Sequence, residues 1–472
     1  MGYEGGMAHL FTEDEVRQLI ATAVAEAVAP LQTRIVQLEA EVARLRRNSG
    51  NSSKPPSSDI VKPPKHDNSP KRRKKRSIGG QPGHAKHERK PFAPEDVDRI
   101  VECELPPEEA RGLRPLSRWH VVQQVELAEK PFVITEYRAR RYRDPRTGQI
   151  IIASLPPEVA AAGLVGPRLS AAIAFQKAAC HMSYTTIQAF WQDVTGFELS
   201  RGQFAKVVQK VSDAIRKPYE ELRDRLAEQD RLGIDESGHK DAGRRHWTWC
   251  FRAPRFTVFH IDPSRGSQVL RTVLGETFGG VIGCDYFSAY HKYMADSGAT
   301  VQFCMAHLIR DIRFLAEQAN KSVARWAEKL LGWLRKLFHT LHRKDRRSRE
   351  KFVPQMEAIR RGFLQQVRHP PEWSEARTLA ARFRGREAEH YFTFLTQPGV
   401  EPTNNLTEQA IRHVVIDRRV TQGTRGDRGM RWCERAWSVL ATCAQHGRRA
   451  FQFLHDALLA HFNAQPAPSL LS

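Results

Sequence analysis

The sequence predicts an α/β protein organised around one mixed β-sheet. Between residues 229 and 319, apolar runs typical of strands alternate with helical patterns, in the order strand, strand, strand, helix, strand, helix-sized segment, strand, helix. Two of the strand-like runs end at an acid, RLGIDESG at Asp235 and GGVIGCDYF at Asp285. A third acid, Glu408, opens the helical pattern NNLTEQAIRHVV. We therefore expect three carboxylates from separate elements to converge at one place.

This element order, with acids on the first and fourth strands, is typical of a ribonuclease-H-like core with a mixed five-stranded sheet and flanking helices. We assign that core to residues 229–319 and 401–446. A helical insertion is expected at 320–400, where ARWAEKLLGWLRKLFHTLH and KFVPQMEAIRRGFLQQV are amphipathic and basic. Residues 447–472 are expected to form a last helix and a tail.

The N-terminal 48 residues are predicted to form one long helix. Apolar residues from Ala21 to Leu45 recur at alternating steps of three and four, the spacing of a coiled-coil seam. Pro30 is expected to break or kink this helix, so the seam depends mainly on the stretch from Leu31 onward. We expect self-association into a homo-oligomer; the alternative is a helix packed on its own body.

Two further regions separate this helix from the core. Residues 49–90 form a basic linker rich in Ser and Pro. Residues 91–165 predict a small β module, in which the single cysteine, Cys103, cannot supply a four-cysteine zinc ribbon. Residues 166–228 are helical, and Ser200 is a candidate N-cap between two helices. These two helices could be a DNA-binding helix-turn-helix or an ordinary packing pair, and the sequence leaves both open.

The charge balance favours a polyanionic partner. Lys and Arg number 74 against 53 Asp and Glu, a formal net charge of +21, which suits nucleic acid; a basic ribosome-associated or membrane-surface protein is the alternative. Seven scattered cysteines argue against a disulfide framework and for a reducing cytoplasm. We find no signal peptide and no run of about 18 apolar residues, and therefore expect a cytoplasmic, nucleoid-associated protein without membrane partners.

The three acids predict metal-dependent phosphodiester chemistry. Two Mg²⁺ or Mn²⁺ ions about 4 Å apart can activate an attacking oxygen and hold the leaving oxygen, and hard carboxylate oxygens suit them. We assign Asp235 as the bridging ligand, with Asp285 and Glu408 on either side. Glu236 is the weaker candidate, because its side chain should point to the opposite face of the strand.

Other polar residues supply weaker hypotheses. Two CxxH pairs, Cys304 with His307 and Cys443 with His446, could bind zinc, but their separation favours buried cysteines and hydrogen-bonded histidines, so zinc is not expected. The basic run in the linker suits contact with a phosphate backbone, with a solvated charge run as the alternative. The expected DNA contacts are Lys71, Arg72, Arg73, Lys74, Lys75, Arg76, His307, Arg310, Arg412, Arg418 and Arg419.

Several of these segments together resemble transposases of the insertion-sequence-66 family, which carry a DDE catalytic domain. The N-terminal heptads followed by NSSKPPSSD are similar to that family's leucine-zipper region and serine-proline signature, and GGQPGH to the turn before its zinc-binding module. DESG, CDYFSAY, CMAHLIRDIRF and NNLTEQAIR are similar to the segments around the family's acids. The resemblance therefore implies catalytic roles for Asp235, Asp285 and Glu408, and accessory proteins from the same mobile element.

The chain departs from the family pattern at a few positions. Only Cys103 remains where the family has a cysteine-rich module, and Thr403 and Gln409 stand where it usually has Asp and Arg. We expect a cut-and-rejoin transposase that frees a 3′ hydroxyl at the terminal repeats of the element and attacks target double-stranded DNA with it. The alternatives are a DNA-binding protein without catalysis and a decayed transposase that binds without cutting.

Overall fold

The computed structural model describes residues 12–46, 91–109, 111, 113–114, 117, 119–128, 131–343 and 348–471. The chain divides into two compact units, one of residues 1–63, 154–189 and 198–472, the other of residues 64–153 and 190–197. The DNA contacts expected from the basic run at 71–76 lie outside the described residues. Within the described ranges, no helix has both the length and the hydrophobicity needed to span a bilayer.

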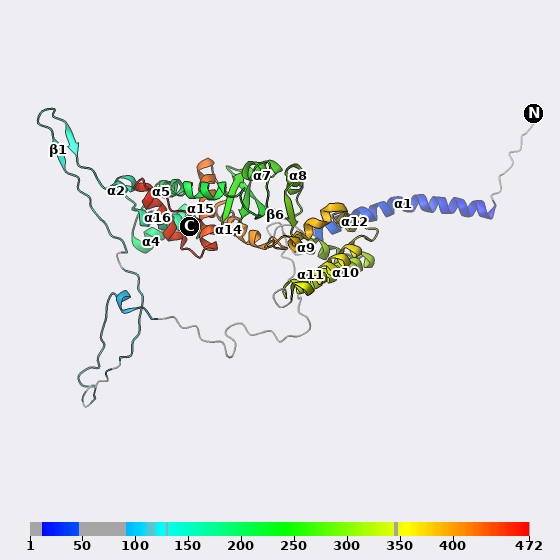
Figure 1. Cartoon of the computed structure of the whole chain (residues 1–472), viewed down its shortest axis with the longest axis horizontal. Helices are drawn as coiled ribbons and strands as arrows, with labels where there is room; N and C mark the ends of the chain where they lie inside the picture. The colour runs from blue at the N-terminus through cyan, green and yellow to red at the C-terminus, as the bar shows by residue number, and fades with distance from the viewer. Residues whose placement is uncertain are drawn as a thin grey trace, which may run out of the picture. The chain divides into compact units, whose positions relative to one another are not determined.

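A mixed five-stranded sheet with the strand order β5-β4-β3-β6-β7 lies at the centre of the first unit (Figure 1). The strands β3, β4 and β5 are antiparallel neighbours, whereas β3, β6 and β7 run parallel. Helices follow β5, β6 and β7, which confirms the α/β class and the predicted order of elements. The bounds are β3 Arg231–Asp241, β4 Arg244–Arg252, β5 Thr257–Asp262, α7 Ser267–Leu274, β6 Val281–Cys284, α8 Ser288–Ser297, β7 Thr300–Phe303 and α9 Met305–Ala316.

The first strand is longer than the sequence indicates. A strand that ends at Asp235 was expected, and this expectation is wrong, because β3 continues to Asp241. The reason is β4, which pairs with β3 up to Asp241 opposite Arg244 and turns at Ala242 and Gly243, both with positive φ. On its other side β3 pairs with β6 only over 231–233. Asp235 therefore lies in mid-strand relative to β4 but just beyond the parallel pairing.

Two long helices complete the sheet. Helix α14, Asn405–Thr421, packs on β3 and β4, and helix α15, Asp427–Gln445, packs on β5. The predicted start of α14 just before Glu408 is confirmed, because Asn404 is its N-cap. Large side chains such as Trp249, Phe259 and Tyr290 are fully buried between these layers. The core thus fixes the strand ends and the start of α14 relative to each other.

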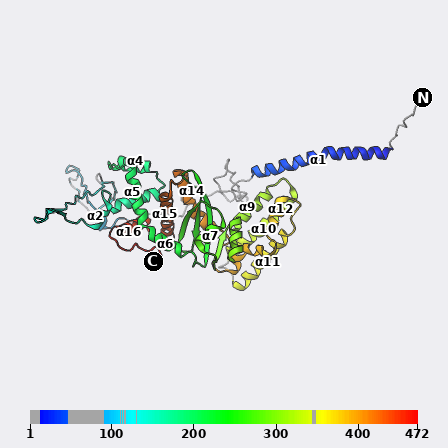
Figure 2. The same ribbon diagram turned by 90° about the horizontal axis from the view of Figure 1, so that it is seen from above.

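Helices fill the interval between α9 and α14, as the amphipathic patterns predict. Helix α10 packs on α9 and α11 and buries Leu330, Leu334 and Leu337. Figure 2 shows this group beside α9, across the sheet from α5 and α16. The bounds are α10 Lys321–Leu341, α11 Arg349–Val367, α12 Ser374–Ala381, η4 Gly385–Tyr391 and α13 Thr393–Thr396.

A second helical group contains the candidate helix-turn-helix. Ser200 caps α5 as predicted, since its hydroxyl accepts the N–H of Gln203 and the Gln203 side chain accepts the N–H of Ser200. Helix α5 buries Phe204, Val208 and Val211 and contacts α3, α15 and α16. The helix-turn-helix itself stays a prediction. The bounds are α2 Pro157–Ala162, α3 Pro167–Ala178, α4 Tyr184–Thr195, α5 Arg201–Ala214, α6 Arg216–Asp224 and α16 Ala450–Phe462.

The N-terminal helix α1, Glu13–Arg46, passes through Pro30 without ending. The expected break is therefore absent; a proline removes one backbone donor, and the helical turns on both sides remain intact. The apolar side chains of the predicted seam are exposed in the single chain, Leu31 at 63% and Ile35 at 55%. Coiled-coil pairing through this seam stays a prediction.

The second unit contains less β-structure than the alternation predicts. Its hairpin, β1 Arg141–Arg143 with β2 Ile150–Ile152, closes through the expected DPRTG turn, with Gly148 at φ 72°. In its other described residues the runs at 120–127 and 131–140 form no strand, and Val133 is 95% exposed. Alternation predicts a strand only where a second layer buries one face. A short 3-10 turn, η2 Pro94–Asp96, precedes these runs.

Candidate active site

Asp235 and Asp285 are brought together by the register of two parallel strands. In that register Gly233 lies beside Gly283, so the residues two positions further along, Asp235 and Asp285, fall at the same level. Because side chains alternate between faces, both carboxylates share the face of the two glycines. Neighbouring strands are about 4.8 Å apart. The register of β3 and β6 therefore makes an adjacent pair of acids.

Helix α14 begins directly over this pair. The side-chain amide of Asn404 donates to the backbone oxygen of Ile234 at 2.7 Å. A Cβ on Gly233 would lie 2.1 Å from Oγ1 of Thr407, the residue before Glu408, so this approach requires glycine. A glycine two residues before each strand aspartate, in GID and GCD, is a signal that the sequence analysis missed.

The acids repel one another in a buried setting. Burial, followed by the charges of Glu236, Asp285 and Glu408, raises the pKa of Asp235 well above its ordinary value. Burial and the charge of Glu236 raise the pKa of Asp285 to about 7, against the opposing effect of Arg265. Buried carboxylates that favour protonation gain most from a nearby cation, because a cation removes both the repulsion and the need for a proton.

Glu236 is the buried acid whose importance the sequence analysis underestimated. Its side chain is 1% exposed, and Nη2 of Arg265 lies 2.7 Å from its Oε1. The hydroxyl of Tyr290 donates to its Oε2 at 2.6 Å. Arg265 in turn lies over the ring of Phe287, 3.9 Å from the centroid. Glu236, which was expected to point to the face of the strand opposite Asp235, is paired with Arg265 and Tyr290. Its charge still raises the pKa of both aspartates.

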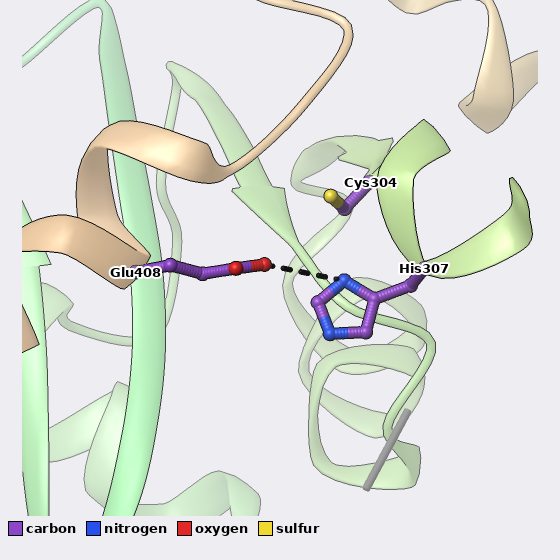
Figure 3. Close-up of side chains that lie close together, drawn as sticks. All are labelled: Cys304, His307 and Glu408. Atoms are coloured by element: carbon purple, nitrogen blue, oxygen red, sulfur yellow. Dashed lines mark ion pairs between the residues drawn. The ribbon is translucent and has the colours of Figure 1, made fainter. Parts of the chain in front are cut away.

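Glu408 is held from its other side by residues of α9. Nδ1 of His307 lies 3.5 Å from Oε1 of Glu408 (Figure 3), and Nη2 of Arg310 lies 3.4 Å from the same oxygen. Burial, followed by the charge of Arg310, lowers the pKa of His307 to about 3, so this ring is neutral. His307 and Arg310, both expected to contact DNA, thus contact the third acid.

Cys304 completes a compact group with His307 and Glu408, as Figure 3 shows. One ligand atom from each of the three lies within 4.8 Å of the others, and Sγ of Cys304 accepts the backbone N–H of Asn404 at 3.2 Å. Among the described residues, this is the group of three that meets that spacing, so the three predicted acids are more widely spread. Acids that bind on opposite sides of two metal ions about 4 Å apart need not lie within 4.8 Å of one another.

The remaining zinc candidates lie elsewhere. Cys443 is fully buried, and Nε2 of His446 lies against the backbone oxygen of Arg255, at the turn between β4 and β5. Cys304 follows β7, at the other edge of the sheet. The structure therefore does not bring the two CxxH pairs together: both cysteines are buried and His446 is hydrogen-bonded, whereas Nδ1 of His307 is buried without a hydrogen-bond partner.

The predicted basic residues of α14 face different surroundings. Arg412 and Arg419 are exposed, whereas Arg418 donates to Oγ of Ser237 at 3.0 Å. Burial, followed by the charge of Arg419, lowers the pKa of Arg418. Their contact with DNA stays a prediction.

The fold and the site define an α/β protein with a half-buried carboxylate cluster where the parallel pairing of β3 and β6 ends. The model of the transposase IS66 family matches residues 162–432, more than half of the chain, and this chain therefore belongs to that family. A family of unknown function matches residues 8–90. The chain is also 24% identical over 434 residues to the uncharacterized protein y4qI of Sinorhizobium fredii, across 84% of this chain and 78% of that protein. The transposase match includes Asp235, Asp285 and Glu408.

Proposed function

We propose that this chain is a DDE transposase that cuts DNA at the ends of an insertion sequence and joins those ends to a target. Its core would be of the ribonuclease-H-like type, with Asp235, Asp285 and Glu408 as the catalytic acids. The observation that supports this most directly is the register of β3 and β6, which sets two half-buried aspartates side by side beneath the start of α14.

The acids fit a pair of divalent cations. They offer hard oxygen ligands, which Mg²⁺ and Mn²⁺ prefer, and their mutual repulsion would be relieved by positive charge. Asp235 would bridge the two ions, with Asp285 and Glu408 on either side. When bound, the ions would activate the attacking oxygen and stabilise charge on the leaving oxygen.

The protein's own groups prepare this site. His307 and Arg310 orient the Glu408 carboxylate from α9. The bond from Asn404 to Ile234 fixes the start of α14 on the strand that carries Asp235. Such fixed placement matters because small displacements of reacting groups strongly lower the rate.

The partners in this proposal are the double-stranded terminal repeats and target DNA, which suit a net charge of +21. The exposed seam of α1 would pair two protomers, so that both ends of the element are held in one complex. Accessory proteins of the same element and association with the nucleoid in the cytoplasm belong to the same proposal.

The test is metal-dependent nicking of a duplex that carries the DNA flanking this coding sequence. Wild type should nick with Mg²⁺ or Mn²⁺ and not with a chelator present. Asp285→Asn keeps the shape of the side chain but removes a charged ligand, and should lower nicking more than about 100-fold. Asp224→Asn, on the exposed side of α6, is the matched control and should nick like wild type.

Two outcomes would contradict the proposal. If Asp285→Asn and Asp224→Asn nick equally, the acids do not carry the chemistry. If wild type binds the duplex and never nicks it with either metal, the chain is a DNA-binding protein or a decayed transposase.

A further inference from the structure

Among the described residues, one edge of β3 has no strand partner between two points where it is paired, although Asn404 and Arg418 of the α14 segment contact this stretch. Strand β6 pairs with it over 231–233, and Thr424 pairs with it again at Asp241. The N–H of Thr424 donates to the oxygen of Lys240 at 2.9 Å, and the N–H of Ala242 donates to the oxygen of Thr424 at 2.8 Å. Strand β4 occupies the opposite edge. The open stretch therefore begins beside Asp235 and ends near Lys240.

A cationic cavity of about 450 Å³ lies at the far end of this open stretch. It is lined by residues of the β3–β4 hairpin and of the C-terminal end of α14, and no acid is among them. The cations are Lys240, Arg245, Arg418 and Arg419. The volume falls in the range of pockets that hold organic ligands rather than a lone ion.

The cavity is built from fixed parts. Arg418 is held by its bond to Ser237, and Arg245 lies over the ring of Trp247, 4.8 Å from the centroid. Gly423 has φ 96°, and a Cβ there would lie 2.1 Å from the oxygen of Lys240, so only glycine allows this loop to dock on β3. The Arg- and Gly-rich segment at 418–429 thus forms one wall.

Among the described residues, no acid lines the cavity. Asp241, the closest acid on the hairpin, stays charged, and its carboxylate accepts the hydroxyl of Thr424 and the N–H of Gly426, each at 2.7 Å. His239, which is 3% exposed and also lines the cavity, has a buried Nδ1 without a hydrogen-bond partner. Nε2 of His239 donates to Oγ1 of Thr424, which itself donates to Asp241, so Nδ1 is an acceptor, and it is the four cations that make the cavity suit an oxyanion.

We propose that this cavity binds a backbone phosphate of the DNA strand whose scissile bond lies at Asp235 and Asp285. This inference rests on the proposed function. Five residues of strand separate Asp235 from Lys240, or roughly 17 Å, a distance that a few nucleotides of one DNA strand can span. The bound phosphate is therefore a few nucleotides from the scissile one.

The test compares two pairs of charge-neutralising substitutions in the full-length chain. Arg245→Gln with Arg419→Gln removes two cavity cations and spares Arg418, which bonds to Ser237. Lys351→Gln with Arg361→Gln removes two exposed cations from α11 and leaves the same net charge. Binding of a mixed-sequence duplex is measured by fluorescence anisotropy with a chelator present, between about 50 and 200 mM salt. Thermal unfolding confirms that both variants are folded.

The slope of log affinity against log salt separates the outcomes. Each lost phosphate contact lowers its magnitude by about 0.9, and the cavity holds one phosphate, so the cavity variant should lose about 0.9 and the α11 variant nothing. Equal slopes in the two variants would overturn the proposal. Inorganic phosphate and a mononucleotide serve as free ligands: if they stabilise wild type alone while the slopes stay equal, the cavity holds a free phosphate and not DNA.

This result is independent of the nicking test. The binding measurement contains no metal and leaves all three acids in place. If the cavity variant loses salt dependence but wild type never nicks DNA, the chain has the binding site without the catalytic function. If wild type nicks DNA but the cavity and α11 variants have equal slopes, the chain has the catalytic function without this binding site.

Discussion

The antiparallel half of the sheet has two outer edges, at β5 and at β3, and only the edge at β5 is covered by hydrogen bonds along its length. At β5, helix α15 closes the edge: Oε1 of Glu434 accepts the N–H of Ile261 at 2.7 Å, and Oγ of Ser438 accepts that of Phe259 at 2.9 Å. Thr442 repeats the contact on β5, one helical turn further along. At β3, beyond the pairing with β6, none of the described strands pairs, and the edge leads from the half-buried aspartates to the cationic cavity.

The closed edge depends on a match of two periods. Residues four apart on a helix are about 6 Å apart along its axis, and residues two apart on a strand are about 6.6 Å apart. Three polar side chains on one stripe of α15 can therefore satisfy every second N–H of β5. An unpaired strand edge is a risk for aggregation, so closing one edge allows the other to remain open for a ligand. Stability is thus concentrated at β5 and binding at β3.

Removal of Glu434 should weaken the closed edge most. Glu434→Ala leaves the N–H of Ile261 without its acceptor and removes the partner of Arg431 and of Nδ1 of His260, 3.0 Å away. We expect the free energy of unfolding to fall by about 3–5 kcal/mol, measured by urea denaturation. Glu357→Ala, in a half-exposed pair on α11, should change it by less than about 1 kcal/mol. Similar losses in both variants would mean that α15 does not close the edge.

At the open edge, Gly233→Ala should affect activity more than folding. The added methyl group meets Thr407 and pushes the start of α14, with Glu408, away from Asp235. We expect nicking to fall by about 100-fold, because a shift of about 1 Å in a reacting group has effects of that size. Gly332→Ala in α10, where a Cβ meets nothing within 4 Å, should retain full nicking. Normal nicking by Gly233→Ala would separate Glu408 from the catalytic acids.

The contributions of His239, at β3, and Glu434, at β5, to the free energy of unfolding should be lost at different pH. Burial, followed by the charges of His246 and Arg418, lowers the pKa of His239 to about 4. Between an unfolded value of about 6.5 and that value, only the unfolded chain takes up the proton, so stability falls with decreasing pH by up to about 1.4 kcal/mol per pH unit. His239→Gln should lower the slope of stability against pH by that amount, while His307 and His413, whose pKa values burial also lowers, keep their own contributions; unfolding across that pH range measures the difference. Parallel curves for wild type and variant would contradict it.

Glu434 has the opposite linkage. Burial alone would raise its pKa, but His260, the N–H of Ile261 and Arg431 outweigh burial and lower it. Its contribution is therefore complete above the unfolded value of about 4.3 and is lost only as the pH falls through the lower folded value. The contribution of His239 should therefore be lost first on acidification and that of Glu434 later.

The sequence could predict what depends on local pattern. The order of strands and helices follows from runs of apolar residues, and the acids Asp235 and Asp285 were found because each follows such a run. The same reasoning predicted too much β-structure in the second unit, where the alternating residues at 120–127 have no layer to pack against. Hydrophobic pattern indicates a strand's faces but not whether the rest of the chain covers them.

What the sequence could not predict depends on contacts between distant residues. The docking of Thr424 on β3 and the bonds from α15 to β5 join positions far apart in the chain. Polar residues such as Ser438 on a helix are more often solvated than buried, so their pattern carries no sign of this role. The glycine two residues before each aspartate can be seen in the sequence, but its role can be explained only from the position of α14.

Ser438 provides the smallest and most specific test of the closed edge. Ser438→Ala removes one hydroxyl and leaves the N–H of Phe259 buried without an acceptor. An unsatisfied buried donor costs about 1–2 kcal/mol, so unfolding should become easier by that amount, with the slope against urea unchanged. Ser374→Ala, exposed at the start of α12, should differ from wild type by less than about 0.5 kcal/mol. If the two variants are equally stable, the contacts of Glu434 and Thr442 close this edge without Ser438, and the match between helix and strand periods is not needed along its whole length.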